Sequence, residues 1–327
     1  MSISMTESAR QDGTDKVAVV AVGGNALIID KQHEDVASQV KAVEETCKHI
    51  ANMIERGWNV IVTHGNGPQV GFILRRNELS AHEVHSTPLD VIGADTQGAI
   101  GYMIARALDN EFVRRGIKRN VAAVVTQVLV DREDPGFKNP TKGIGGFTTK
   151  ENAERFEAEG WMVKEDAGRG WRRMIASPMP LEIVEIDAIK TLIANGFIVV
   201  GVGGGGIPVI KDENGELKGV FAVIDKDRAS ALLAAEMQVD VFLISTAVEK
   251  VAINFNKPDQ KWLDVMTLSE AKELHKQGHF LSGSMGPKIE AMIAFMEANP
   301  NGKGLITDPP HIVDALDGKT GTWIVRD

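Results

Sequence analysis

Residues 16–25 read Lys-Val-Ala-Val-Val-Ala-Val-Gly-Gly-Asn, a short run of β-branched and small apolar residues that stops at two glycines. Such a run is typical of a strand that is buried on both faces of a parallel sheet. Gly23 and Gly24 allow a tight turn and a close approach of backbone N–H groups to a ligand. Ligands of open α/β sheets bind at this end of the strands, and a following helix N-terminus favours anions. Taken alone, the stretch is also compatible with an ordinary turn between a strand and a helix.

The same arrangement occurs twice more along the chain. A predicted strand at 58–63 leads into His-Gly-Asn-Gly-Pro at 64–68, and a predicted strand at 197–202 leads into a run of glycines at 203–206. Proline suits the first turn of a helix after the second of these glycine turns. Three glycine turns at the carboxyl ends of three strands indicate a binding site for a multiply charged anion.

The third glycine turn also matches the dinucleotide-binding pattern G-x-G-x-x-G at 201–206. That pattern must open a helix directly. Residues 208–210 and 218–223 instead flank Asp-Glu-Asn-Gly at 212–215, which predicts a β-hairpin with an Asn-Gly turn. The match is therefore read as accidental, and NAD is not expected. A Walker A loop is missing from the sequence as well.

The bulk composition bounds the class of protein. With 327 residues, 43% hydrophobic and 25% charged, the chain is expected to form one large α/β domain or two lobes. The net charge of −9 argues against a nucleic-acid-binding face. A single cysteine, Cys47, fits a reducing cytoplasm. Residues 1–15 are polar and are expected to form a disordered tail.

Strands and amphipathic helices alternate along most of the chain. Helices are expected at 36–54, 89–115 and 181–195, and a single third strand at 121–130. A further helix is expected to begin after Asp225, a candidate N-cap. The rhythm is interrupted at 131–179, which is rich in Gly, Pro and charges and far exceeds the usual connection of about six residues. We expect an inserted protruding subdomain there. The predicted fold class is α/β, a three-layer α/β/α sandwich with a mainly parallel open sheet.

Seven segments carry a closer resemblance to a known family. They lie at 21–26, 63–71, 139–142 (Asn-Pro-Thr-Lys), 165–172 (Glu-Asp-Ala-Gly-Arg-Gly-Trp-Arg), 203–209, 223–227 and 278–288. In order and in sequence they resemble the carbamate kinases, from about residue 17 to the end of the chain. The glycine turns alone suggest only the wider amino-acid-kinase family. The segments at 139–142 and 165–172 are typical of the carbamate kinases.

The resemblance implies an activity and an organisation. Carbamate kinases are homodimers that reversibly transfer a phosphoryl group from MgATP to carbamate, giving ADP and carbamoyl phosphate, usually in the direction of ATP synthesis during arginine or amidine catabolism. For this chain, the resemblance implies one kinase domain at 16–327, with a carbamate-binding part at about 16–195 and a nucleotide-binding part at about 196–327. The insertion at 131–179 would close over the site as a lid. Mg²⁺ would be held through the ATP phosphates and by no dedicated protein ligands.

The resemblance also assigns roles to individual residues. Three lysines, Lys142, Lys226 and Lys288, are expected to contact the oxygens of the transferring phosphoryl group. Asp225 is the fourth catalytic residue expected, and it would fix the ammonium groups of these lysines. The residues expected to bind carbamate and phosphate are Gly23, Gly24, Asn25, Gly65, Asn66 and Gly67. Those expected to bind the nucleotide are Gly204, Gly205, Gly206, Asp227, Val248, Val251, Met285 and Gly286.

Carbamate is already an anion, so its oxygen needs no general base to attack phosphorus, and transfer depends on positioning and on cations. His64 is therefore interpreted as a hydrogen-bonding brace, with a catalytic base as the alternative. Two glycines, Gly143 and Gly146, stand where many relatives have proline, which should loosen the loop that carries Lys142. We therefore expect this loop to hold Lys142 away from the phosphates until substrate binds. Ala247 stands where related kinases often have an acidic residue, so nucleotide selectivity stays open.

Two other functions are compatible with the sequence. One is a kinase of another small carboxylate or of UMP within the amino-acid-kinase family, and the other is a nucleotide-binding sensor without turnover. A sensor would be expected to lose some of the phosphate-facing lysines, and none is lost here.

Overall fold

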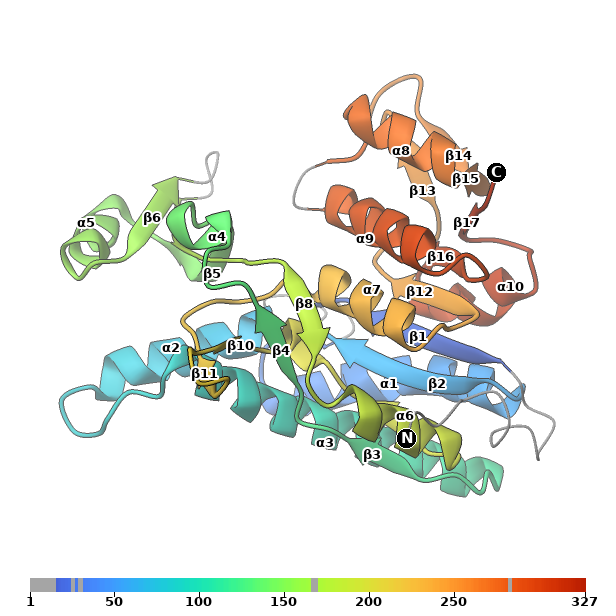
Figure 1. The fold of residues 1–327 in the computed structure, drawn as a ribbon, viewed down its shortest axis with the longest axis horizontal. Coiled ribbons are helices and arrows are strands. Elements are labelled where there is room, and N and C mark those ends of the chain that lie inside the picture. Colours follow the sequence, from blue (N-terminus) through green and yellow to red (C-terminus); the bar gives the residue numbers. More distant parts are fainter. Residues whose placement is uncertain (1–15, 25–26, 29–31, 166–169, 282–283) are drawn as a thin grey trace.

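A computed structural model describes residues 16–24, 27–28, 32–165, 170–281 and 284–327. The tail expected at 1–15 lies outside the described residues. In the described part of the chain, eight strands form the main sheet in the order β15-β17-β16-β12-β1-β2-β9-β3, and β16–β17 is its antiparallel pair. Helices cover both faces, which confirms the three-layer α/β architecture (Figure 1). No helix in the described ranges is long and apolar enough to cross a membrane.

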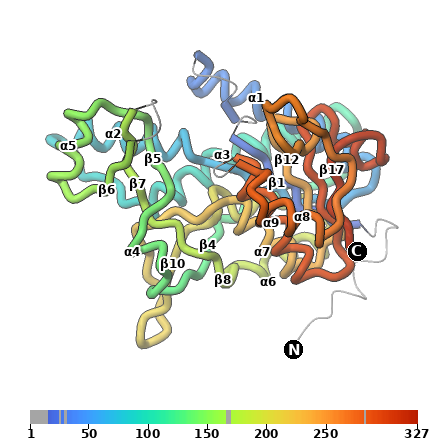
Figure 2. The backbone as a smooth tube through the Cα atoms, turned by 90° about the horizontal axis from the view of Figure 1, so that it is seen from above, coloured from blue at the N-terminus to red at the C-terminus, as the bar shows by residue number. Residues whose placement is uncertain are grey.

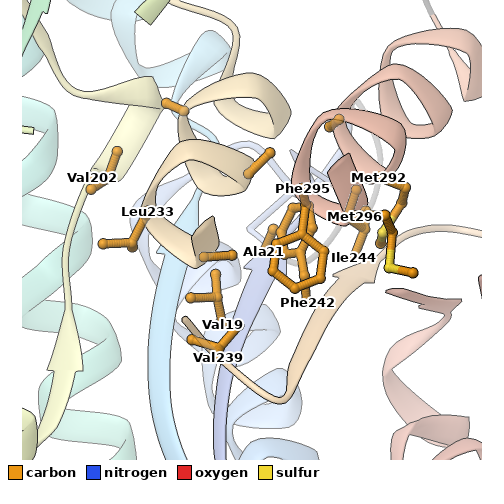
Figure 3. Packing of buried hydrophobic residues seen from close by; sticks show 14 of the residues in the cluster. Val19, Ala21, Val202, Leu233, Val239, Phe242, Ile244, Met292, Phe295 and Met296 are labelled. Atoms are coloured by element: carbon orange, nitrogen blue, oxygen red, sulfur yellow. The ribbon is translucent and has the colours of Figure 1, made fainter. Parts of the chain in front are cut away.

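Strand β1 (Val17–Val22) lies in the middle of this sheet, as expected from its sequence. It pairs in parallel with β2 (Asn59–His64) on one side and with β12 (Val241–Ser245) on the other. Alternate residues of β1 enter different cores, Val19 and Ala21 in one and Ala18 and Val20 in the other. Figure 3 shows the first core, in which Phe242 and Phe295 meet edge to face at 5.5 Å between ring centroids. Burial on both faces explains why the strand reads as a continuous apolar run.

The helices divide between the two faces of the sheet. One face is covered by α1 (Val36–Glu55), α3 (Leu89–Arg115) and α10 (Ile312–Leu316). The other face is covered by α6 (Ile186–Ala194), α7 (Lys226–Glu236), α8 (Leu268–Lys276) and α9 (Met285–Ala298). The remaining strands of the main sheet are β3 (Val121–Ala123), β9 (Ile198–Val200), β15 (Val265–Thr267), β16 (Lys303–Thr307) and β17 (Thr322–Val325).

The expected single strand at 121–130 is wrong. β3 belongs to the main sheet, whereas β4 (Gln127–Val130) belongs to a separate sheet ordered β11-β10-β4-β8. The chain turns between them because Gln97 of α3 binds both backbone groups of Thr126, with its side-chain Oε1 accepting from the Thr126 N–H at 2.7 Å and its Nε2 donating to the Thr126 carbonyl at 3.1 Å. A lone buried glutamine on a helix gives no sequence signal for this bend.

The helix expected at 181–195 is also wrong over its first residues. Residues Pro180–Ile183 form β8, which pairs antiparallel with β4, and α6 starts only at Ile186. Pairing with β4 outweighs the local helical pattern here. The predicted hairpin is confirmed, since β10 (Ile207–Lys211) and β11 (Leu217–Gly219) pair antiparallel.

A protruding unit stands at one end of the molecule, apart from the C-terminal elements (Figures 1 and 2). It contains a sheet ordered β5-β7-β6, formed by β5 (Lys142–Thr148), β6 (Met162–Glu165) and β7 (Trp171–Ile175), together with α5 (Lys150–Ala158). Its own small core is built from Ala153, Phe156 and Val163. The short α4 (Pro135–Lys138) precedes it. We call the segment from β5 to β7 the protruding subdomain.

The protruding subdomain packs on α2 (Gly67–Ser80). Ile144 of β5 and Ile175 of β7 share an apolar cluster with Val70 and Leu74 of α2. Gly71 of α2 lies so close to the subdomain that a Cβ there would stand 3.2 Å from the Gly145 Cα. The subdomain therefore rests on the helix whose N-terminus follows the second glycine turn.

Candidate active site

A cavity of about 330 Å³ opens at the carboxyl ends of β1, β2 and β9, where the three glycine turns were predicted to meet. The N-terminal residues of three helices line it: Gly67 and Pro68 of α2, Lys226 and Asp227 of α7, and Pro287 and Lys288 of α9. Backbone N–H groups at helix N-termini favour an anion. The ends of α2 and α9 have no side-chain cap, whereas Asp225 accepts from two of the N–H groups of α7.

Ten of the predicted site residues line this cavity. They are Gly24, Gly65, Asn66, Gly67, Lys142, Gly204, Asp225, Lys226, Asp227 and Lys288. Segments as distant in sequence as Gly24 and Lys288 thus meet at one place. The other predicted residues lie elsewhere or, for Asn25, outside the described residues.

Two of the lysines share one carboxylate, and it is Asp227, not Asp225 as the sequence led us to expect. Asp227 Oδ1 lies 2.7 Å from Lys226 Nζ, and its Oδ2 lies 3.2 Å from Lys288 Nζ. The Asp227 side chain is only 6% exposed. Burial opposes its charge, but the two ammonium groups outweigh burial and lower the pKa of Asp227 to about 2. The carboxylate therefore stays ionised and orients both ammonium groups within the cavity.

The third lysine reaches the cavity from the protruding subdomain. Lys142 Nζ donates to Asp225 Oδ2 at 2.5 Å. Asp225 also caps α7, as predicted, because its Oδ1 accepts from the backbone N–H of Asp227 at 2.9 Å. Burial raises the pKa of Asp225, but Lys142 and the backbone donor outweigh it, and the pKa lies below its usual value.

The structure contradicts the expectation that the loop holds Lys142 away from the site. Lys142 is the first residue of β5, and it pairs with Ile175 of β7 in the subdomain sheet. Ile144, two residues further on, is 5% exposed and packs on α2. Strand pairing and this packing fix the start of β5 at the cavity, although two glycines follow Lys142.

The second glycine turn is held by buried side chains. Asn66 Nδ2 donates to Thr96 Oγ1 of α3 at 2.9 Å. The side chain of Lys226 passes over Gly65, where a Cβ would lie 3.6 Å from its Cδ. In the first turn, the Gly23 N–H donates to the Ser245 carbonyl at 3.1 Å, so this group serves the sheet and Gly24 alone of the two lines the cavity.

His64 lies beneath the second turn and is 1% exposed. Its Nδ1 donates to the Gly65 carbonyl at 3.0 Å, and a Cβ on Gly203 would stand 2.3 Å from its Nε2. Burial lowers the pKa of His64 to about 4, so the imidazole is neutral at pH 7. A neutral imidazole wedged between two glycine turns is what a brace requires.

The third glycine turn serves mainly for close packing. Gly204 alone of its glycines lines the cavity, with φ 67°. A Cβ on Gly205 would stand 2.4 Å from the Ile224 carbonyl oxygen, and one on Gly206 would stand 2.2 Å from Val128. Gln97 Nε2 donates to the Gly203 carbonyl at 2.9 Å and so joins this turn to the bend at Thr126. Sequence reasoning missed Gln97 entirely.

Four residues predicted to bind the nucleotide, Val248, Val251, Met285 and Gly286, lie in different environments. Val251 begins β13 (Val251–Ile253), which pairs with β14 (Lys261–Leu263). Val251 is 0% exposed and part of the main core, so its side chain has no surface to offer a base. Val248 is half-buried in the turn after β12, Met285 packs partly on the core, and Gly286 is buried near the Leu281 carbonyl. None of the four lines the cavity.

In the ranges that the structure describes, no group of three or more His, Cys, Asp or Glu side chains is arranged to hold a metal ion. The two carboxylates at the cavity, Asp225 and Asp227, are each paired with a lysine. A divalent cation bound here would therefore take most of its ligands from phosphate oxygens and water, as Mg²⁺ prefers.

Comparisons with known proteins point to one family. Residues 16–306 match the model of the amino acid kinase family. The chain is 49% identical to the carbamate kinase of Thermococcus kodakarensis, over 95% of this chain and 100% of that protein. It is also 49% identical to a carbamate kinase-like protein of Escherichia coli, over 95% and 99% of the two chains. The structure of a carbamate kinase from Giardia lamblia bound to AMP-PNP superposes with a TM-score of 0.89 at 45% identity, over 95% of this chain and 99% of that one.

Proposed function

The chain belongs to the amino acid kinase family as a carbamate kinase, a phosphotransferase that interconverts ATP and carbamate with ADP and carbamoyl phosphate, and from this premise we propose how its cavity transfers the phosphoryl group. The observation that carries the proposal is the meeting of three lysines, two carboxylates and three helix N-termini around one cavity. Phosphoryl transfer needs little covalent chemistry from the protein, so positioning and charge stabilisation account for most of the catalysis.

Each group has a role in this proposal. Lys226 and Lys288, oriented by Asp227, neutralise charge that develops on the phosphoryl oxygens, and Lys142 does so from the protruding subdomain. Asp225 orients Lys142. The glycine turns at Gly24, Gly65 and Gly67 supply backbone N–H groups for carbamate and the transferred phosphoryl group.

No residue needs to remove a proton from the attacking oxygen. Carbamate enters as an anion, and its oxygen attacks the γ-phosphorus in line with the departing ADP oxygen. In the reverse direction, the β-phosphate oxygen of ADP attacks carbamoyl phosphate. The low pKa of His64 and its full burial support a brace that holds the Gly65 turn in place.

The nucleotide is proposed to bind as MgATP or MgADP, beside the C-terminal elements that follow β12 and precede α9. The AMP-PNP complex of the Giardia lamblia relative supports an ATP site in this fold. Asp227 would orient the magnesium phosphates through its two lysines. Gly205, Gly206, Val248, Met285 and Gly286 stay proposed members of the nucleotide site, as supports or wall.

Further properties are proposed from the same family membership. The enzyme would act as a homodimer in the cytoplasm, in the direction of ATP synthesis from carbamoyl phosphate. Its carbamate-binding part would extend over about 16–195 and its nucleotide-binding part over about 196–327. The segment at 131–179 would act as the lid, with Lys142 as its contribution to the chemistry.

The test is direct. The purified protein should form ATP when it is given ADP, Mg²⁺ and carbamoyl phosphate, and EDTA should abolish the reaction. The controls are the same mixture without protein, and ATP consumption with N-acetylglutamate or UMP in place of carbamate. ATP formation restricted to carbamoyl phosphate supports the proposal. Phosphorylation of another acceptor, or nucleotide binding without turnover, would overturn it.

A further inference from the structure

We propose that Arg173 of β7 is a positioning residue, which clamps the protruding subdomain to α2 through Glu78 and thereby fixes Lys142 at the cavity. The inference rests on the role proposed above for Lys142. The sequence analysis did not single out Arg173, which directly follows the family-typical segment that ends at Arg172. In the structure Arg173 does not line the cavity. Its environment in the fold distinguishes it.

Arg173 and Glu78 join two separate parts of the molecule. Arg173 Nη1 lies 2.6 Å from Glu78 Oε1, and the two side chains are 10% and 22% exposed. Exposed ion pairs contribute little, but a pair removed from water is different, since loss of one partner leaves an uncompensated charge. Glu78 belongs to the last turns of α2, the helix whose N-terminus lines the cavity at Gly67.

Aromatic rings hold the guanidinium in place. Its Cζ lies 4.4 Å from the ring centroid of Phe156 and 4.8 Å from that of Trp161. Both distances are within the range of cation–π attraction. Trp161 in turn meets Phe221 at 5.4 Å between centroids, on the segment that leads to Asp225. A planar guanidinium can stack on two rings and still pair with a carboxylate, which an ammonium group cannot match.

A short path leads from this clamp to Lys142. Arg173 lies opposite Ile144 in the pairing of β7 with β5, and Ile175 lies opposite Lys142. Just beyond β7, the Ala176 carbonyl accepts from the Val223 N–H at 3.0 Å, two residues before Asp225. The ion pair of Arg173 with Glu78, the pairing of β5 with β7 and the ion pair of Lys142 with Asp225 therefore form one connected set of contacts. A shift of β7 on α2 would move Lys142 relative to the phosphate-binding end of that helix.

The size of the expected effect follows from geometry. Misplacement of a catalytic group by about 1 Å costs up to roughly 10²-fold in rate. Arg173→Lys keeps the charge but loses the planar fork and the stacking, and Glu78→Gln keeps the shape but loses the charge. We expect each to lower kcat by roughly 10-fold or more, with KM for ADP changed less than about twofold because Lys226 and Lys288 are untouched.

A matched control is available on the same carboxylate. Arg75 Nη1 donates to the other oxygen of Glu78 at 3.0 Å, but its side chain is 62% exposed. Arg75→Ala should leave kcat unchanged within about twofold, as expected for an exposed pair on one helix.

The decisive measurement is a double-mutant cycle with Lys142. If Arg173 acts through Lys142, Arg173→Lys and Glu78→Gln should lower kcat in the wild-type background and have less than about a twofold effect in a Lys142→Ala background. A merely structural role would lower kcat by the same factor in both backgrounds. Circular dichroism checks the fold of each variant, and Glu78→Gln carries the test if Arg173→Lys does not fold.

The outcomes are separable. Equal losses in the two backgrounds, or no loss of kcat in either single variant, would overturn the inference and leave the proposed function intact. Full kcat in Lys142→Ala alone would remove Lys142 from the proposed mechanism and this inference with it. Absence of ATP formation by the wild-type protein would refute the proposed function itself.

Discussion

The cavity draws its cations from two differently built parts of the molecule. Lys226 and Lys288 come from helices packed on the main sheet, are 15% and 17% exposed, and share the buried Asp227. Lys142 comes from the small sheet of the protruding subdomain, is 41% exposed, and pairs with Asp225. The main sheet and its helices, here called the body, thus provide a rigid pair of charges that is largely removed from water. The subdomain provides a single charge that is more exposed, on a strand of a small sheet with little core of its own.

This difference has a consequence for catalysis and stability. Charges in a drier environment interact more strongly with a phosphoryl group, so loss of a body lysine should affect the chemistry most. A lysine carried by a small unit should be more sensitive to changes that shift that unit.

The largest effect is expected from the body lysines. Lys226→Ala and Lys288→Ala should each lower kcat by roughly 10²-fold or more with the fold retained, because each removes charge stabilisation of the transition state. Steady-state kinetics with carbamoyl phosphate and MgADP measure this. Lys211→Ala is the matched control, since Lys211 is 49% exposed and pairs with Glu182 in the separate sheet ordered β11-β10-β4-β8. A body lysine whose variant keeps near-normal kcat has no place in the mechanism.

The next effect concerns the subdomain lysine. Lys142→Ala should lower kcat by roughly 10- to 100-fold while leaving ADP affinity almost unchanged, because Lys142 pairs with Asp225 and not with the carboxylate that orients the body lysines. ADP binding by calorimetry and kinetics on the same variant measure both quantities.

Lys138→Ala is the control for this prediction, since Lys138 is close by in sequence and 80% exposed. A fall in ADP affinity in proportion to kcat would make Lys142 a static nucleotide ligand. The contrast between the body and the subdomain would then be lost.

The sequence predicted the body better than the subdomain, for physical reasons. Strand β1, the three glycine turns and the Asp225 cap of α7 are local patterns that burial and backbone geometry impose on adjacent residues. Ten site residues were therefore identified from motifs. The pairing of Lys142 with Asp225 joins residues 83 positions apart and depends on how the subdomain packs on α2, which no local pattern encodes. The clamp at Arg173 was missed for the same reason.

The wrong predictions of a single strand at 121–130 and of Val251 in the nucleotide site have a similar origin. The bend between β3 and β4 depends on Gln97, which is distant in sequence and looks like any polar residue on a helix. Val251 was expected in the nucleotide site from the family resemblance, but its burial is decided by the packing of β13 on the core. Tertiary packing decided both cases.

The stability of the body should depend on pH through the buried His64. The folded-state pKa of His64 is about 4, below the usual 6.5, so the unfolded chain takes up the proton first as the pH falls. The free energy of unfolding should therefore decrease below pH 6.5 and level off below pH 4, by about 2 kcal/mol between pH 7 and pH 5. Urea unfolding at several pH values measures this.

The contribution of His64 is isolated by comparing variants. His64→Gln should show a shallower decrease over the same pH range, whereas His82→Gln, at a side chain that is 73% exposed, should match the wild-type protein. An unchanged slope in His64→Gln would mean that His64 is not held neutral by burial, and would restore a protonated imidazole beside the Gly65 turn as a candidate in the chemistry.

The smallest effect is expected on the local stability of the subdomain, from substitution of the glycines that follow Lys142 in β5. A Cβ on Gly146 would meet nothing within 4 Å, whereas one on Gly143 would stand 2.8 Å from Arg172 Cδ. Arg172 is held there, since its Nε donates to the Gly145 carbonyl at 3.0 Å and its guanidinium lies 5.4 Å from the Phe147 ring centroid. Gly146→Ala should stabilise the subdomain by about 0.4–1 kcal/mol through the unfolded state, and Gly143→Ala should destabilise it.

Global unfolding is dominated by the main core, so the measurement must be local. Hydrogen exchange of β5 and β7 amides reports opening of the subdomain. Slower exchange by roughly two- to fivefold in Gly146→Ala and faster exchange in Gly143→Ala are expected, with amides of β1 and β12 unchanged in both variants. Equal exchange in the two strand pairs would mean that the subdomain does not open separately from the body. In that case Lys142 would be as firmly held as Lys226 and Lys288, and its exposure alone would set it apart.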